Sequence, residues 1–152
     1  MKSNNLKMLL ASLSLLLFFN VQAESLHQAV YANDIESVKS HLQKGADLNQ
    51  LGHTVYGFGS ALHLAVRENH REIVKLLLEQ GAVVDIRDYY DYTPLHDAAW
   101  NGNLDMVKLL IDAGADIRAT NYSGHTPLSC ARAKNQLVVI QFIEGMLMTA
   151  SN

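Results

Sequence analysis

The chain contains side chains from which metal, hydrolytic and nucleotide sites are built, but their spacing assembles none of these sites. A zinc site needs converging ligands at set spacing, and no His-x₃-His or Cys-x₂-Cys pair is present. There is no Gly-x-Ser-x-Gly elbow and no Walker motif, and Gly57-Phe58-Gly59 lacks the third glycine of a dinucleotide loop. We therefore predict no metal site, no cofactor and no catalytic residue. The histidines outside the repeated positions described below are His41, His53, His70 and His125.

Two other features could support acid–base or thiol chemistry. His96 and Asp97 are neighbours, but no further base or ligand accompanies them. Cys130, the single cysteine, stands beside Ala131 in a predicted helix, where a small apolar side chain is expected for packing. An enzyme is accordingly the remotest of three functional alternatives.

The elements that would position these residues recur along the chain. A leucine-led tetrad returns at spacings of 36, 33 and 33 residues, and a Gly-Ala pair at 45, 81 and 114 returns at 36 and 33. Two independent landmarks thus give one period, with a three-residue insertion between Leu48 and Ser60. The tetrads are Leu26-His27-Gln28-Ala29, Leu62-His63-Leu64-Ala65, Leu95-His96-Asp97-Ala98 and Leu128-Ser129-Cys130-Ala131.

Each period predicts two helices. Thr93-Pro94 can cap and begin the first helix, and Gly102 permits the sharp turn that follows. Apolar residues at helical spacing, such as Val107 and Leu110, then indicate the second helix. Gly114 is expected to end it.

This pattern resembles the ankyrin repeat family, and the resemblance covers about residues 25–145. It implies an all-α solenoid of stacked antiparallel helix pairs, with β-hairpin loops projecting on one edge. It also implies a structural role, hydrogen bonding to turn groups, for His27, His63 and His96. The residues that carry the resemblance are Thr93-Pro94-Leu95-His96, Ala98-Ala99, Gly102, Val107, Leu109-Leu110 and Gly114-Ala115-Asp116. We predict a repeat domain over 24–148, with units at about 25–52, 53–88, 89–121 and 122–148, and a tail at 149–152.

The first 23 residues predict export. Lys2 and Lys7 precede an uncharged run from Met8 to Phe19, and Val21-Gln22-Ala23 offers a small-residue cleavage site before Glu24. This is typical of a secretory signal peptide, with an uncleaved anchor as the alternative. Cleavage leaves ten basic and fifteen acidic residues, which argues against a nucleic-acid surface and a polybasic membrane patch. We expect an exported protein, periplasmic in a Gram-negative cell and otherwise secreted, without membrane contact after cleavage.

The aromatic residues mark the predicted recognition surface. Tyrosines gather in the expected hairpins, and Tyr31 and Trp100 share one position near the end of the first helix. In the family that the chain resembles, hairpin tips and the exposed face of the first helix form the usual concave binding surface. Tyrosine and tryptophan dominate binding hot spots. The predicted partner-binding residues are Tyr31, Tyr56, Arg67, Tyr89, Tyr90, Tyr92, Trp100, Asn101, Tyr122 and His125.

We therefore predict a non-catalytic module that holds a protein partner on this Tyr/Trp-rich face, in a masking, scaffolding or protective (immunity) role. The alternative is a self-associating structural protein, because the last predicted helix ends in Met146-Leu147-Met148 with few polar side chains. Terminal repeats normally present a polar outer face. We expect a monomer in the first case and a homo-oligomer in the second.

Overall fold

The computed structural model describes residues 25–54 and 57–149, with side chains except at 53, 54, 57 and 58. The predicted signal peptide, Tyr56 and residues 150–152 lie outside the described part. Its elements are α2 (Leu26–Tyr31), α3 (Ile35–Gln43), β1 (Gly52–Thr54), β2 (Gly57–Gly59), α4 (Ala61–Arg67), α5 (Arg71–Glu79), α6 (Pro94–Asn101), α7 (Leu104–Asp112), α8 (Pro127–Ala133) and α9 (Leu137–Thr149).

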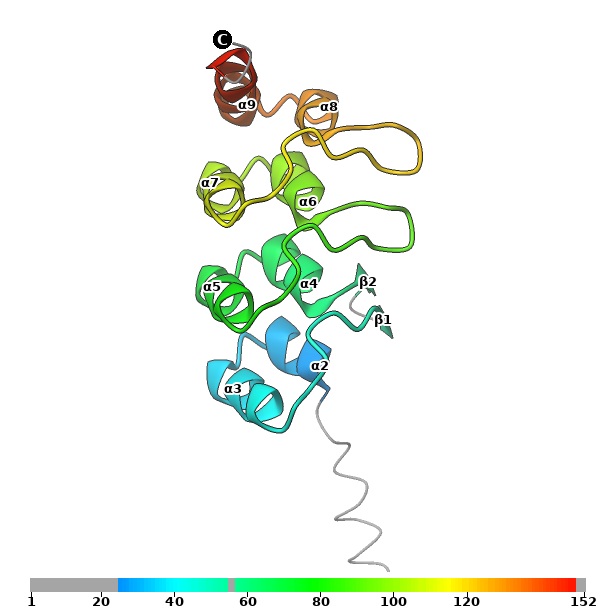
Figure 1. The fold of residues 1–152 in the computed structure, drawn as a ribbon, viewed down its shortest axis with the longest axis vertical. Helices are drawn as coiled ribbons and strands as arrows, with labels where there is room; N and C mark the ends of the chain where they lie inside the picture. Colours follow the sequence, from blue (N-terminus) through cyan, green and yellow to red (C-terminus); the bar gives the residue numbers. More distant parts are fainter. Residues whose placement is uncertain (1–24, 55–56, 150–152) are drawn as a thin grey trace, which may run out of the picture.

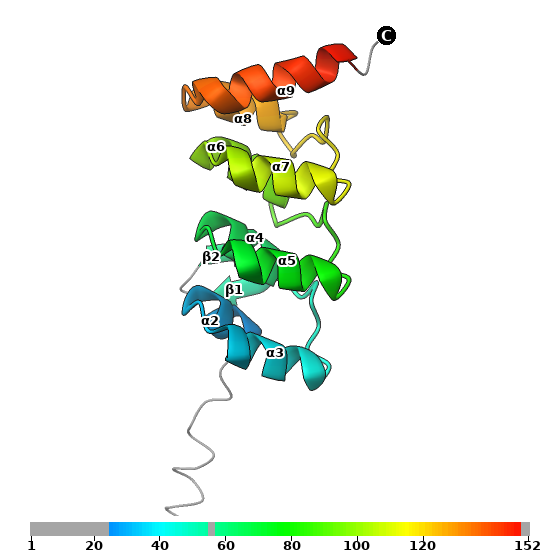
Figure 2. The same cartoon turned by 90° about the vertical axis from the view of Figure 1, so that its left-hand side faces the viewer.

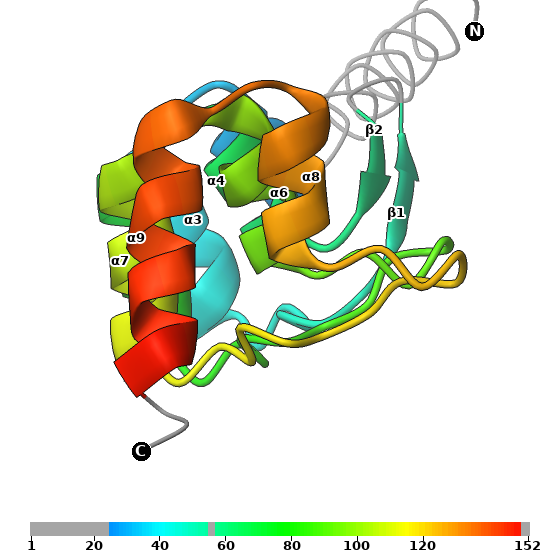
Figure 3. The same ribbon diagram turned by 90° about the horizontal axis from the view of Figure 1, so that it is seen from above.

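The helices form one stack of antiparallel pairs (Figure 1). The first helices of the pairs, α2, α4, α6 and α8, make one column, and α3, α5, α7 and α9 make the other (Figures 1 and 2). Loops that precede the first helices extend to one side of the stack (Figure 3). The inserted loop alone forms paired strands among the described residues, with His53 opposite Phe58. The predicted all-α repeat architecture is confirmed.

Local chemistry explains where the helices begin and turn. Ser60, Thr93 and Thr126 take extended backbone angles ahead of α4, α6 and α8, as N-caps do. Between α6 and α7, Gly102 has φ 72°, and a Cβ there would collide with the Gln136 side chain. Asparagine, which tolerates positive φ, takes the equivalent place in the other units, at 33, 69 and 135.

The core lies between the two columns and continues through the stack. Fully buried side chains come from both helices of each pair and from adjacent pairs, so each pair completes the core of its neighbour. Helix α9 closes the stack with Val139 and Ile143 buried. The largest fully buried aliphatic side chains are Leu62, Ile73, Leu77, Leu95, Met106, Leu110 and Ile143.

A ladder of buried histidines ties each pair to the next loop. Nε2 of His27, His63 and His96 lies 3.2, 2.9 and 2.9 Å from a backbone oxygen 29 to 32 residues further along the chain. In His63 and His96 the Nδ1 atom accepts a backbone N–H from the helix cap, so Nε2 carries the proton that it donates. The structural role implied for these residues is thereby confirmed, and each loop is fixed against the preceding unit.

No described helix combines the length and the apolar character needed to cross a membrane. At the end of the stack, α9 nevertheless exposes Leu137, Val138 and Met148, which are between 60% and 72% accessible.

Candidate partner-binding site

The loop before α6 is built around the carboxylate of Asp88, which is 7% exposed. Its Oδ1 accepts the backbone N–H groups of Tyr90 at 2.8 Å and Tyr92 at 3.0 Å. The backbone N–H of Asp88 donates to Tyr92 O, and Asp91 takes a positive φ of 62° at the tip. This arrangement turns the chain tightly and holds the two tyrosines at fixed positions.

The next loop repeats the construction with an amide. Asn121 Oδ1 accepts the backbone N–H groups of Ser123 at 3.0 Å and His125 at 2.9 Å. The two loops are joined through the backbone, because the N–H of Tyr122 donates to Tyr90 O at 3.2 Å. The Asp88 loop and the Asn121 loop therefore form one continuous edge of the stack, and this edge carries the side chains of both loops.

Most of the predicted aromatic residues are exposed, and they lie on the surface formed by α2, α4, α6, α8 and the loops, which we call the inner face. Tyr122 is 87% exposed, and Tyr31, Tyr89, Tyr90 and Trp100 are between 44% and 59% exposed. None of these rings is required to fill the core.

Tyr92 differs from the others, because it is half-buried and its ring stands edge-on to His96 with centroids 5.5 Å apart. It thus contributes to the fold as well as to the surface.

A hollow of about 330 Å³ lies between the Asp88 loop and helices α4 and α6. Four of the predicted residues meet in it, namely Arg67, Tyr90, Tyr92 and Trp100. Its walls thus combine aromatic rings with charged groups from two successive units. The lining residues are Arg67, Asp88, Tyr90, Tyr92, His96, Asp97 and Trp100.

Arg67 is engaged by two carboxylates of the hollow. Its Nε lies 2.8 Å from Asp97 Oδ2, and its Nη2 lies 3.3 Å from Asp88 Oδ2. Burial raises the pKa of Asp97 to about 7, against the lowering effect of the Arg67 charge. Burial also lowers the pKa of His96, so its imidazole is neutral at neutral pH.

The remaining predicted residues lie around the hollow or further along the inner face. Asn101 Nδ2 donates to Arg67 O at 3.4 Å, and Tyr122 and exposed His125 occupy the adjoining loop. Tyr89 precedes Tyr90 in the loop of the hollow. Tyr31 stands at the end of α2, two helix pairs before α6.

Sequence reasoning missed Asp88 and Asp97 as members of this surface. Asp97 stands where the other units carry Gln28, Leu64 and Cys130, so a charge occupies a position that is uncharged elsewhere in the chain. That contrast between units was the available signal.

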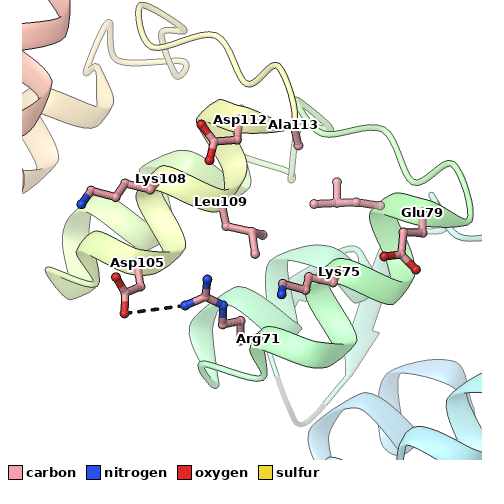
Figure 4. A pocket seen from close by; sticks show the side chains of 9 residues that line it. Arg71, Lys75, Glu79, Asp105, Lys108, Leu109, Asp112 and Ala113 are labelled. Atoms are coloured by element: carbon pink, nitrogen blue, oxygen red, sulfur yellow. Dashed lines mark ion pairs between the residues drawn. The ribbon is translucent and has the colours of Figure 1, made fainter.

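A second hollow, of about 560 Å³, lies between α5 and α7 in the other column (Figure 4). Its only ion pair among the residues drawn joins Arg71 and Asp105 at 3.7 Å, and both side chains are at least half exposed. Exposed pairs of this kind contribute little free energy. Long charged side chains of both signs form most of its wall, together with Leu78, Leu109 and Ala113.

Two features of the described residues bear on metal and thiol chemistry. They contain no group of three or more His, Cys, Asp or Glu side chains able to hold a metal ion. Burial, with a further contribution from the Asp97 charge, raises the pKa of Cys130 to about 11, so the thiol stays protonated at neutral pH. A nucleophilic thiolate is therefore not provided there.

Comparisons with known proteins agree with this architecture. The family model for ankyrin repeats in three copies matches residues 26–121, and one for ankyrin repeats in many copies matches residues 102–143. A putative ankyrin repeat protein of Rickettsia bellii is 28% identical over 99 residues, covering 51% of this chain and 41% of that protein. Zebrafish (Danio rerio) inversin is 41% identical over 63 residues, covering 41% of this chain and 6% of inversin.

Protein phosphatase 1 regulatory subunit 12A of mouse is 49% identical over 41 residues, covering 27% of this chain. The matched part is about 4% of the length of that protein, so the activity of the whole regulatory subunit says nothing about the activity of this chain.

The chain belongs to the ankyrin repeat family, because the family model covers more than half of it. Ankyrin repeats are protein–protein interaction modules and are generally non-catalytic.

Proposed function

We propose that this chain is an exported, non-catalytic module that holds a protein partner on its inner face and thereby masks, scaffolds or protects it. The observation that carries the proposal is the exposure of Tyr89, Tyr90, Trp100 and Tyr122 on adjoining loops and helix ends. Exposed aromatic side chains that the core does not use are typical of binding hot spots.

The electrostatics of the site support binding rather than turnover. The Arg67 guanidinium is held by two carboxylates, and the adjacent imidazoles of the ladder are hydrogen-bonded on both nitrogens to backbone or cap groups. These groups are occupied in holding loops and helices together. A general acid or base must lie within hydrogen-bond distance of a substrate proton. In this network the imidazole N–H groups donate to backbone carbonyls of the protein instead.

Export rests on the sequence alone. The basic start, the short apolar run and the small residues before Glu24 support a cleaved signal peptide. N-terminal sequencing of the chain recovered from the exported fraction tests it: a start at Glu24 supports cleavage, and an intact Met1 in the membrane fraction refutes it.

Partner capture tests the proposed function. The tagged chain is used to capture protein from the native exported fraction, and it is compared with a Tyr90→Ala/Trp100→Ala variant. The matched control is Lys75→Ala/Lys108→Ala, two exposed positions on the opposite column. Circular dichroism and thermal melting of all three chains establish that the fold is kept. We expect the inner-face variant to lose the partner and the control to retain it; equal capture by both, or loss by the control alone, refutes the proposal.

The apolar end of α9 supports a second candidate function, self-association. Leu137, Val138 and Met148 are exposed at the end of the stack, where no further unit among the described residues covers them. Sizing of the protein and of a Val138→Ser/Met148→Ser variant separates the two. A concentration-dependent oligomer that becomes a monomer in the variant supports self-association, and a monomer in both refutes it.

A further inference from the structure

The hollow beside Trp100 carries more negative charge than the fold requires. Asp88 organises its loop by accepting two backbone N–H groups, but Asn121 does the same in the next loop with a neutral amide oxygen. Asp97 occupies a position that the uncharged residues Gln28, Leu64 and Cys130 fill elsewhere in the chain. The Asp97 charge is therefore not explained by the construction that the units share, whereas the Asp88 charge is engaged by Arg67.

The charges in the hollow do not cancel. Among its lining residues Arg67 is the basic one, and it pairs with both Asp88 and Asp97. When both carboxylates are ionised, the lining keeps one negative charge, because His96 is neutral. Asp88 is committed to the fold, since Oδ1 binds two N–H groups and Oδ2 binds Arg67. Asp97 accepts from Arg67 at Oδ2, and its carboxylate forms part of the wall of the hollow, where it can accept from a further cation.

The aromatic walls favour the same sign of ligand. The face of a tryptophan ring attracts cations, with a gain that grows when the cation is desolvated. Trp100 already binds one, because Lys134 Nζ lies 4.3 Å from the ring centroid. Lys134 itself is outside the set of residues that line the hollow. Tyr90 and Tyr92 add two further rings on the loop side.

We propose that this hollow receives a basic side chain, lysine or arginine, that projects from the partner protein. Its volume of about 330 Å³ is at the lower end for ligand pockets, which suits one long side chain rather than a cofactor. The cation contacts the Asp97 carboxylate and lies against the rings of Tyr90 and Trp100. This proposal rests on the proposed function, since it takes the inner face as the docking surface.

The test uses small probes and the single tryptophan of the chain. Nα-acetyl-L-arginine amide and Nα-acetyl-L-lysine amide are titrated into the protein at about pH 8, above the pKa of Asp97. Nα-acetyl-L-citrulline amide, the neutral counterpart of the arginine probe, is the matched ligand control. The indole N–H resonance of Trp100 reports binding, because no other residue gives a signal of this kind.

The test variants are Asp97→Asn and Asp88→Asn, the second of which copies Asn121 of the neighbouring loop. The control variant is Asp112→Asn on the opposite column.

We expect a saturable shift of the Trp100 resonance with both basic probes and none with citrulline. Asp97→Asn should weaken binding about tenfold or more, as loss of a partly buried charge partner does. Asp88→Asn should weaken it less, because it removes the net negative charge of the lining and no direct contact, and Asp112→Asn should bind as wild type. Lys134→Gln should bind the basic probes at least as well, because it removes a competing cation. Added salt should weaken all of these interactions.

Several results would overturn the proposal. Equal shifts with the citrulline and arginine probes, or unchanged binding in Asp97→Asn, would show that the charge of the hollow plays no part in binding. A shift with acetate that disappears in Lys134→Gln would identify an anion site instead. Tighter binding of the free diamine putrescine than of either amide would assign the hollow to a small free cation and not to a partner side chain.

The two proposals fail in different ways. If Tyr90→Ala/Trp100→Ala abolishes partner capture but no basic probe shifts Trp100, the cation assignment fails and the binding face stands. If the probes bind as expected but capture is independent of the inner face, the proposed function fails.

Discussion

His63 provides a stability effect whose size follows from its environment. The side chain is fully buried, Ser60 N–H donates to its Nδ1 at 3.2 Å, and its Nε2 donates to Tyr92 O at 2.9 Å. Burial lowers the pKa of His63 from 6.5 to about 4. In the unfolded chain it takes up a proton near 6.5, so between these values the unfolded state binds more protons than the folded state. Its contribution is therefore complete above pH 6.5 and is lost as the pH falls toward 4.

The magnitude follows from the shift. A depression of the pKa from 6.5 to about 4 corresponds to about 3 kcal/mol of unfolding free energy lost over the whole window. Asp97 acts in the opposite sense, since a raised pKa of about 7 gives stability that is lost as the pH rises through 7. Wild-type stability alone therefore mixes the two effects. A comparison of variants removes the Asp97 contribution, because every chain in it carries Asp97.

The perturbation is His63→Ser, which copies Ser129, whose hydroxyl accepts the cap N–H of Thr126 in the last unit. At pH 7.5 we expect it to cost about 2–4 kcal/mol, from the cavity and from loss of the His63 hydrogen bond to the Tyr92 carbonyl, which keeps the backbone N–H of Asp88 as a donor. At pH 4.5 the difference from wild type should shrink by about 2–3 kcal/mol, because wild type has lost most of the His63 contribution.

Urea unfolding followed by circular dichroism at each pH measures these differences. Ile73→Val, at a fully buried position without a titratable group, is the control, and its cost of about 1 kcal/mol should not change with pH. A His63→Ser difference that is the same at pH 7.5 and pH 4.5 would refute the conclusion that the fold keeps this imidazole neutral.

Three other experiments test the packing. Gly102→Ala should lower the unfolding free energy by at least about 1–2 kcal/mol, because φ is 72° and the Gln136 side chain occupies the space of a Cβ. Gly145→Ala, in open space on α9, should raise the unfolding free energy by up to about 1 kcal/mol. Thermal melting measures both variants, and equal effects would contradict the turn geometry. Leu110→Ala should cost about 2–5 kcal/mol in urea unfolding, and a cost below about 1 kcal/mol would show that the site is not packed. Cys130 should react with a thiol reagent only after unfolding, since it is 4% exposed; rapid reaction of the folded chain would contradict its burial.

The scaffold was predictable because it depends on local rules repeated at one period. Thr93-Pro94, Gly102 and the apolar residues of the second helices each specify backbone or core positions within their own unit. Exposure of Tyr122 and Trp100 was also predictable from their place in the repeat, although the role of these rings in binding stays a prediction.

The hollow could not be read from one unit, because its charges cross between units. Arg67 ends α4 and reaches Asp97 on α6, 30 residues later, and Asp88 in the intervening loop. A repeat pattern gives the positions that units share, and it does not show which unshared side chains meet. Tyr92 illustrates the same point: the pattern placed it on the binding edge, and its ring also packs against His96.

The most direct test of the central claim places a photo-reactive side chain on each face of the stack. Benzoylphenylalanine is introduced at Tyr122 on the inner face or at Lys108 on the opposite column, and each chain is irradiated in the native exported fraction. We expect a crosslink to one protein partner from position 122 and none from position 108. A crosslink from position 108 without one from 122 would place the partner on the other face and contradict the account.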